Sequence, residues 1–238
     1  MVVLITGANS GLGYELAKRL QGEGYTLILL VRKKSLKKIK RKFDRQYIVD
    51  IDFFTDNIQE KLKNSLPNII PDVIIHAAGG KLEHDNHPID IKILIKSFTL
   101  NLFSAIEINN FFIKKALLLN RYLRIIQVSS DAGITGRASP SYSISKGALN
   151  TYVKNIGRMY AKDNITICAV VPSIFVHKNS IWTKKKKKNP GYYKKIKNET
   201  TLKKFASVKE VADVIVDISK SKNMLYSAEL INITAGNI

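Results

Sequence analysis

The beginning of the chain places a glycine-rich turn between an apolar run and an amphipathic segment. The residues of Val2–Thr6 are almost all apolar and predict a strand, and Tyr14–Leu20 has apolar side chains at helical spacing. Three glycines lie between them, in Thr6-Gly7-Ala8-Asn9-Ser10-Gly11-Leu12-Gly13. Glycines at this spacing allow a tight turn, a close approach of the backbone to a ligand, and close packing of helix on strand. A strand, this turn and a helix form the context that predicts a dinucleotide-phosphate site at the start of the helix.

The alternation of apolar runs and amphipathic segments continues along the whole chain. Seven strands are predicted, at Val2–Thr6, Tyr25–Val31, Tyr47–Val49, Val73–His76, Leu123–Val128, Ile165–Val171 and Leu230–Ile233. Helices are predicted between them, at Tyr14–Leu20, Ile58–Leu66, about Ile89–Leu118, Tyr142–Ala161 and Val208–Ile218. Strands that are apolar throughout and are followed by helices indicate a parallel sheet buried on both faces. We therefore expect an α/β protein with one domain over 1–238, a doubly wound parallel sheet of about seven strands with helices on both faces.

Composition excludes several classes of protein. The chain is 45% hydrophobic and 24% charged, as in ordinary globular proteins, and has no run of 18 apolar residues without charge. A single cysteine, Cys168, excludes an intrachain disulfide framework. The four histidines, at 76, 84, 87 and 177, lack metal-ligand spacing, so we expect no metal site. No basic leader precedes the apolar run at the start, and we expect a cytoplasmic protein without a membrane span.

The net charge of +20 is concentrated in two regions of the chain. One is Arg32–Arg45, and the other is Lys178–Lys204, which includes the run Lys184–Lys188. Such an excess is compatible with a polyanionic partner, and equally with a general preference for lysine at exposed positions. The second region belongs to a polar stretch, about 175–205, without clear periodicity, which is typical of a mobile substrate loop. Its aromatic residues, Phe175, Trp182, Tyr192 and Tyr193, could pack in such a loop or hold an anionic substrate.

Basic residues follow the second predicted strand, where an acidic residue would bind the ribose 2′-hydroxyl of NAD. This chain has Arg32 there, followed by Lys33 and Lys34. A guanidinium can hold a 2′-phosphate with two parallel hydrogen bonds, which favours NADP(H) over NAD(H). The alternative is a solvated basic helix start. Asp50, at the end of the third strand, is placed to meet the adenine amino group, or else is a turn or capping residue.

Tyr142 and Lys146 lie one turn apart on a predicted helix. A tyrosine ordinarily ionises near pH 10, and a nearby ammonium would lower its pKa toward the range of neutral proton transfer. Ser129 and Ser130 follow the fifth strand, and either hydroxyl could hydrogen-bond a substrate oxygen.

Together these motifs resemble the short-chain dehydrogenase/reductase family over essentially the whole chain. The family pattern TGxxxGxG matches Thr6–Gly13, and its YxxxK matches Tyr142 and Lys146. Its NNAG matches His76-Ala77-Ala78-Gly79, with both asparagines replaced, its helical asparagine matches Asn101, and its serine matches Ser130. Other departures are a slightly short interval from Ser130 to Tyr142, which keeps Ser129 as a second candidate, and Pro172-Ser173 in place of Pro-Gly.

The resemblance implies a Rossmann fold and an NADP-dependent ketoreductase similar to the 3-oxoacyl carrier-protein reductases. It implies that Tyr142 is the general acid and that Ser130 polarises the carbonyl group. Lys146 would lower the pKa of the tyrosine and bind the nicotinamide ribose, and Asn101 would hold a water of the proton relay. The implied cofactor-binding residues are Gly7, Asn9, Ser10, Gly11, Leu12, Gly13, Arg32, Asp50, Ala78, Gly79, Tyr142, Lys146 and Pro172.

The partners and the alternatives follow from the same resemblance and from the charge. We expect a small carbonyl or alcohol substrate, anionic or carrier-linked in one interpretation, and a homodimer or homotetramer. Two other classes are weighed: a non-catalytic NADP-binding regulatory protein and, motivated only by the net charge, a nucleic-acid-binding protein.

Overall fold

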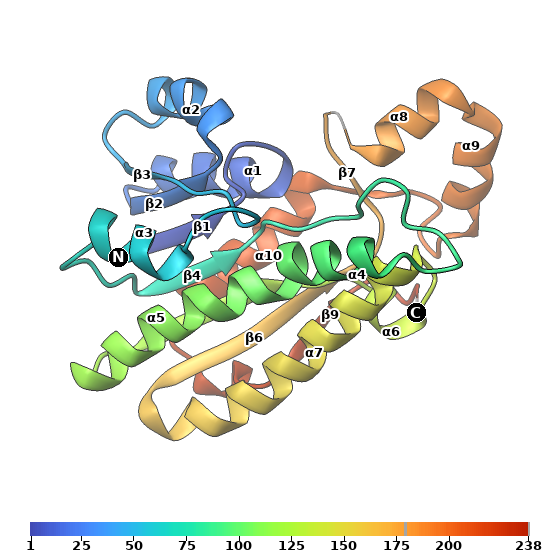
Figure 1. Ribbon diagram of the computed structural model, residues 1–238. Coiled ribbons are helices and arrows are strands. Elements are labelled where there is room, and N and C mark those ends of the chain that lie inside the picture. The colour runs from blue at the N-terminus through green and yellow to red at the C-terminus, as the bar shows by residue number, and fades with distance from the viewer. Residues whose placement is uncertain (179, 238) are drawn as a thin grey trace.

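A parallel sheet of seven strands forms the centre of the molecule (Figure 1). The computed structural model describes residues 1–178 and 180–237. The strands of this sheet are β1 (Val2–Thr6), β2 (Thr26–Val31), β3 (Tyr47–Asp50), β4 (Val73–His76), β5 (Leu123–Val128), β6 (Ile165–Pro172) and β9 (Leu230–Ile233). Their order in space is β3-β2-β1-β4-β5-β6-β9, and every neighbouring pair is parallel. The predicted doubly wound sheet is therefore confirmed. From β1 the chain adds β2 and β3 on one side, and it then adds β4 and the later strands on the other side. This change of direction between β1 and β4 opens a crevice at their carboxyl ends.

Helices cover both faces of the sheet, because neighbouring residues on each strand point to opposite sides. On β1, Val3 and Ile5 belong to one apolar cluster, whereas Leu4 belongs to the other. The first cluster is completed by α1 (Gly11–Gly22), α2 (Leu36–Lys42) and α10 (Val208–Lys220). The second is completed by α3 (Ile58–Ser65), α5 (Ser104–Leu118) and α7 (Pro140–Tyr160). The continuous apolar strands in the sequence are thus explained by burial on both sides.

The long predicted helix before β5 is interrupted in the structure. It consists of α4 (Ile91–Phe98), a π-helical turn at Thr99–Phe103, and α5. Helix α4 also begins two residues after the predicted start at Ile89, because Asp90 caps it by accepting a hydrogen bond from the Lys92 amide. Single π-helical turns occur frequently at functional sites, and this one contains Asn101.

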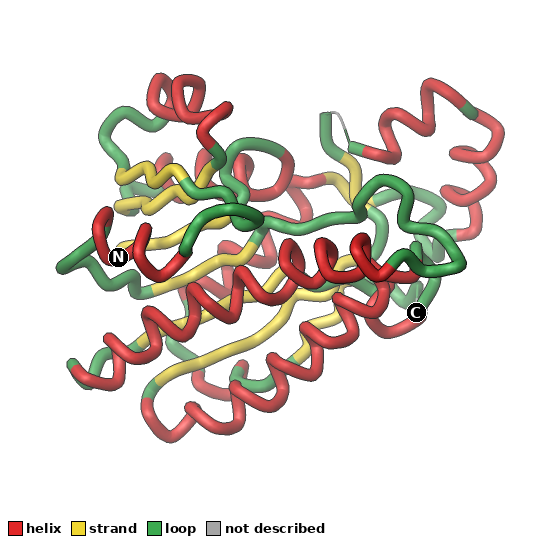
Figure 2. The backbone as a smooth tube through the Cα atoms, viewed as in Figure 1, coloured by secondary structure: helices red, strands yellow, loops and turns green. Residues whose placement is uncertain are grey.

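The lysine-rich stretch folds into helices, although the sequence suggested an aperiodic loop (Figure 2). It contains β7 (Phe175–Val176), α8 (Ile181–Lys188) and α9 (Pro190–Glu199), and β7 pairs with β8 (Ala206–Ser207), which follows the stretch. The side chains of Ser180 and Asn189 cap α8 and α9 by accepting hydrogen bonds from the amides of Thr183 and Tyr192. These helices present few apolar side chains, so periodicity does not reveal them. We call residues 175–205 the lid; its mobility stays a prediction.

The remaining elements are short. They are α6 (Ala132–Thr135) and 3-10 turns at Lys33–Ser35, Ala161–Asp163 and Met224–Tyr226. Helix α7 begins at Pro140, two residues before its predicted start, since proline is well suited to the first helical position. Among the residues described, none of the helices has the length and apolar character needed to cross a membrane.

Candidate active site

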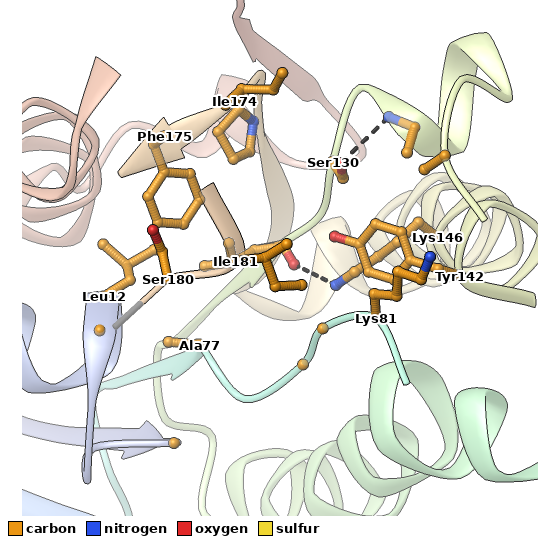
Figure 3. Close-up of a pocket in the computed structure, with 18 of the residues that line it drawn as sticks. Leu12, Ala77, Lys81, Ser130, Tyr142, Lys146, Ile174, Phe175, Ser180 and Ile181 are labelled. Carbon is orange, nitrogen blue, oxygen red and sulfur yellow. Dashed lines mark hydrogen bonds between the residues drawn. The ribbon is translucent and has the colours of Figure 1, made fainter. Parts of the chain in front are cut away.

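A cavity of about 1100 Å³ opens at the carboxyl ends of the central strands. Its wall begins at the glycine-rich turn, passes the ends of β2, β4, β5 and β6, and reaches α7 and the lid. Figure 3 shows Tyr142, Lys146 and Ser130 on one side of this cavity and Leu12 with the lid residues Phe175 and Ser180 on the other. The glycine-rich turn that predicts a phosphate site and the side chains of Ser130, Tyr142 and Lys146 therefore line the same cavity.

The glycine-rich turn is packed too tightly for side chains. Gly7 has a φ of +70°, and a Cβ there would lie 2.8 Å from the Cα of Ala78. A Cβ on Gly13 would lie 2.5 Å from the carbonyl oxygen of Gly7, so Gly13 allows α1 to pack on the turn rather than lining the cavity. The Thr6 hydroxyl accepts a hydrogen bond of 3.0 Å from the Ala78 amide and ties the turn to the end of β4. The turn leaves an open cradle at the start of α1, which fits a dinucleotide pyrophosphate.

The predicted contacts to the adenosine end of a cofactor are only partly in the cavity. Arg32 lines the cavity with an exposed side chain, while Lys33 and Lys34 do not line it. Asp50 is also outside the cavity wall, which is formed at this place by Ile51 and Asp52. Asp52 was missed from the sequence because it lies two residues beyond the strand end, and its carboxylate accepts a hydrogen bond from the Phe54 amide.

The side chains of Tyr142, Lys146 and Ser130 converge on the cavity. The Lys146 ammonium nitrogen lies 6.0 Å from the centre of the Tyr142 ring and donates a hydrogen bond of 2.7 Å to the carbonyl oxygen of Val128, at the end of β5. The Ser130 hydroxyl donates to the Asp131 carboxylate at 3.1 Å, accepts from the Ala132 amide at 3.2 Å, and lies beside Tyr142. The side chain of Lys146 is only 3% exposed, which fixes it behind the tyrosine.

The structure distinguishes the two candidate serines. The Ser129 hydroxyl is buried and donates a 2.5 Å hydrogen bond to the amide oxygen of Asn150, within α7. Ser130 has the hydroxyl that lies beside Tyr142. Although the interval between Ser130 and Tyr142 is slightly short, the serine beside Tyr142 is therefore Ser130 and not Ser129.

Burial raises the pKa of Tyr142 above its ordinary value, and the nearby Asp131 carboxylate raises this pKa further. The Ser130 hydroxyl is the second largest influence and lowers this pKa, but by less than burial raises it. The expectation that Lys146 lowers the pKa of the tyrosine is thus not met in this structure. The physical reason is that the lysine is buried as well, and burial lowers its own pKa to about 7, which weakens its charge at neutral pH.

Asn101 lies behind the cavity wall, in the π-helical turn. Its side-chain oxygen accepts from the Gly80 amide at 2.8 Å, and its side-chain nitrogen donates to the carbonyl oxygens of Ser97 and Gly80 at 3.0 and 3.2 Å. A Cβ on Gly79 would lie 2.9 Å from the Asn101 oxygen and 3.3 Å from the Lys146 nitrogen. Glycine at this position thus allows Asn101 and Lys146 to approach the strand end closely. The side chain of Asn101 has protein partners at both polar atoms, so the predicted relay water would have to use its backbone carbonyl.

The structure reveals a residue that sequence reasoning missed, Asp85. Its carboxylate is 2% exposed and accepts hydrogen bonds from the amides of Ser141 and Tyr142, at 2.9 and 3.0 Å, and from the hydroxyl of Ser139. It thus caps the N-terminus of α7 at the tyrosine itself. No local pattern indicates this contact, because Asp85 is 57 residues from Tyr142 in the chain.

The substitution of His76 for asparagine leaves the strand end well packed. Its Nε2 atom lies 2.8 Å from the side-chain oxygen of Asn109, whose nitrogen donates to the Tyr152 hydroxyl at 3.0 Å. Burial lowers the pKa of His76 to about 4, so this ring is neutral under physiological conditions. Pro172 and Ser173 line the cavity together with Ala78 and Gly79.

The lid covers the outer part of the cavity with aromatic and basic side chains. Trp182 and Tyr192 have parallel rings 6.3 Å apart, and the Lys185 ammonium lies 4.6 and 5.0 Å from their centres. All three residues line the cavity. Stacking of this kind holds the ammonium group at a defined position.

Comparisons with known proteins agree with this geometry. The family described as short chain dehydrogenase matches residues 1–188. The 3-oxoacyl-[acyl-carrier-protein] reductase FabG of Buchnera aphidicola subsp. Schizaphis graminum is 28% identical over 239 residues, covering 98% of this chain and 95% of the relative. The same reductase of Rickettsia typhi is 30% identical over 174 residues, covering 71% of this chain and 70% of the relative.

Solved structures show the same fold. ElxO with NADP bound has a TM-score of 0.86 at 20% identity and covers 99% of this chain and 98% of its own. The L-sorbose reductase of Gluconobacter frateurii, complexed with NADPH and L-sorbose, has a TM-score of 0.84 at 22% identity, covering 99% and 95%. With the family match over most of the chain, these findings show that the protein is an oxidoreductase of the short-chain dehydrogenase family.

Proposed function

We propose that this enzyme reduces a carbonyl group to an alcohol with NADPH, with Tyr142 as the proton donor. The observation that carries the proposal is the convergence of Tyr142, Ser130 and Lys146 in a cavity that begins at the glycine-rich turn. NADPH, when bound, supplies the hydride that reaches the carbonyl carbon. The residues of the chain then bind the carbonyl oxygen and give it a proton.

The chemistry of the three side chains is consistent with reduction. The raised pKa of Tyr142 keeps its phenol protonated at neutral pH, which is the form that donates a proton. The Ser130 hydroxyl turns from the Asp131 carboxylate to the carbonyl oxygen and polarises it. After proton transfer the new phenolate charge favours the charged form of Lys146, whose pKa of about 7 allows it to take up a proton readily.

The binding of NADPH uses the turn and Arg32. The backbone amides at the start of α1, around Gly11, would bind the pyrophosphate, with Asn9, Ser10 and Leu12 lining the cavity beside them. The exposed Arg32 side chain lines the cavity and would bind a 2′-phosphate, and Lys146 would bind the nicotinamide ribose. We assign to Asp52, which lines the cavity, the adenine contact that the sequence suggested for Asp50.

We propose a carrier-linked or otherwise anionic substrate. Two relatives, which match 98% and 71% of this chain, are named as 3-oxoacyl-[acyl-carrier-protein] reductases. On this chain, Lys185 of the lid lines the cavity between two aromatic rings, which would place a positive charge beside the entering substrate.

We also propose that the enzyme is a homodimer or homotetramer. Large apolar side chains are exposed on α4, α5 and α7, including Ile95 (56%), Leu118 (84%) and Met159 (54%). Analytical ultracentrifugation of the purified enzyme would test this, and a monomer at micromolar concentration would contradict it.

The direct test of the function is a spectrophotometric assay of NADPH and NADH oxidation with a panel of ketones that includes acetoacetyl thioesters. We expect turnover with NADPH and at least one member of the panel, and a preference for NADPH over NADH of about tenfold or more. Absence of NADPH binding in a parallel fluorescence titration would overturn the proposal.

A further inference from the structure

His177 lies where the lid crosses the glycine-rich turn. It follows β7, and its imidazole lines the cavity. A Cβ placed on Gly11 would lie 3.0 Å from the Nε2 atom of this ring and 3.2 Å from its Cε1 atom. The ring edge that carries Nε2 therefore faces the turn at the start of α1. In Figure 3 the neighbouring lid residues Phe175 and Ser180 lie next to Leu12, on the same side of the cavity.

The start of α1 offers an anion site without a charged side chain of its own. Residues 6–13 contain no charged residue, and the first turn of α1 has no acidic residue. The Ser10 side chain makes no capping hydrogen bond with α1 in the part of the chain that is described. The helix N-terminus attracts phosphate through its amides and its dipole. A side chain that neutralises the pyrophosphate charge must therefore come from another segment, and the His177 ring faces the turn at Gly11.

The hydrogen bond on the other side of the ring determines how His177 can act. Its Nδ1 atom lies 2.8 Å from the carbonyl oxygen of Lys178, which can only accept. Nδ1 therefore carries a proton, and Nε2 of the neutral ring presents a lone pair toward the turn. Only the protonated ring presents an N–H at Nε2 that can donate to a phosphate oxygen.

We propose that the His177 imidazolium is a ligand of the cofactor pyrophosphate, so that NADPH binding is coupled to protonation of this side chain. The proposal rests on the NADPH-dependent function above. It assigns to the lid a direct part in cofactor binding, in addition to its position over the substrate region.

The backbone of His177 connects this contact to the lid. Its carbonyl oxygen accepts hydrogen bonds from the Ser180 amide at 3.0 Å and the Thr183 hydroxyl at 3.2 Å, at the start of α8. A phosphate held by the ring would therefore fix the beginning of α8. The charged side chains that line the same cavity are Arg32, Asp52, Lys81, Asp131, Arg137, Lys146, Lys185 and Glu199. None of them shares a hydrogen bond with the imidazole within residues 1–178 and 180–237.

The test is a fluorescence titration of NADPH binding between pH 5.5 and 8.5, using the wild type, His177→Gln and His177→Lys. Lys146 lines the same cavity and has a pKa of about 7, so the wild-type profile is compared with that of His177→Gln, which retains Lys146. His177→Gln should bind NADPH about tenfold more weakly at pH 6 and converge with the wild type at high pH. His177→Lys should bind tightly without this pH dependence.

Two controls separate this contact from other effects. His84→Asn removes a histidine outside the cavity, at a positive φ of 58° that asparagine tolerates, and should leave the NADPH profile unchanged. Adenosine 2′-monophosphate lacks the pyrophosphate, so its Kd should be equal in the wild type and His177→Gln at each pH.

Two outcomes would overturn the inference. Equal NADPH affinities of the wild type and His177→Gln at every pH would remove His177 from the site while leaving the proposed function intact. Failure of the wild type to bind NADPH at any pH would instead overturn both the proposed function and this inference.

Discussion

The catalytic centre and the lid are both rich in polar residues, but they are held in place by different interactions. At the centre, Lys146, Ser129 and Asp85 are at most 3% exposed, and each has a hydrogen-bond partner. In the lid, Lys185 and Tyr192 stay in contact with solvent and are arranged by stacking and by helix caps. The difference suggests that substitutions at the centre will affect the chemical step, whereas those in the lid will affect binding.

The largest expected effect is that of Tyr142→Phe. This change removes only the hydroxyl that donates the proton, so kcat should fall by about 10²–10⁴-fold. The Kd for NADPH should change little. Steady-state kinetics and a fluorescence titration measure the two quantities, and Tyr160→Phe near the end of the same helix is the matched control. Retention of wild-type turnover by Tyr142→Phe would remove this residue from the mechanism.

A smaller effect is expected for Asp85→Ala, which leaves the amides of Ser141 and Tyr142 without their carboxylate acceptor. The start of α7 should shift, and kcat should fall by about 10–100-fold with little change in NADPH affinity, because small displacements of a catalytic group are costly. Asp90→Ala, which removes the cap of the neighbouring helix α4, is the control. Equal kcat values for the two variants would show that the cap of α7 does not position the tyrosine.

Arg32→Asp should reverse the cofactor preference, by about tenfold or more relative to the wild type, because a carboxylate repels the 2′-phosphate. The ratio of kcat/KM for NADPH and NADH measures this. Lys34→Asp makes the same change of charge outside the cavity and should keep the wild-type preference. A wild type that favours NADH would contradict the assignment of Arg32.

The smallest effect is expected in the lid, for Lys185→Met. Loss of this ammonium should raise the KM for an anionic substrate such as acetoacetyl coenzyme A by a few fold, with kcat nearly unchanged, because partly exposed charges contribute about 1 kcal/mol or less. A neutral ketone ester should show no change, nor should Lys187→Met, whose side chain is exposed and outside the cavity. A fall in kcat without a change in KM would break the proposed division between centre and lid.

The accuracy of the sequence predictions follows the same division. The strands could be predicted because they are buried on both faces, which requires apolar runs such as Val2–Ile5 and Ile167–Val171. The lid helices could not, because they bury few of their side chains and depend on the caps at Ser180 and Asn189. The π-helical turn at Asn101 has no apolar pattern that distinguishes it from the helices on either side.

Within the site, motifs located residues but did not determine their surroundings. The roles of Gly7, Tyr142 and Lys146 could be predicted from the sequence because each role requires a particular residue type at a fixed spacing in a motif. Asp85 and Asp52 could not be predicted in this way, since no motif fixes how far they lie in sequence from the other residues of the site. The sequence also predicted a lowered pKa for Tyr142, whereas the structure raises it. The separation of one helical turn from Lys146 does not show how deeply the two groups are buried.

The sequence alone determined the order of strands and helices, the glycine-rich turn and the identity of the side chains that can transfer a proton. These are properties of local spacing and of apolar burial, which the linear chain records directly. The tertiary structure decided which serine faces the tyrosine, how solvent exclusion changes the charge of Lys146, and which lid residue reaches the turn at Gly11. Such properties depend on contacts between residues far apart in the chain and on the water that those contacts displace.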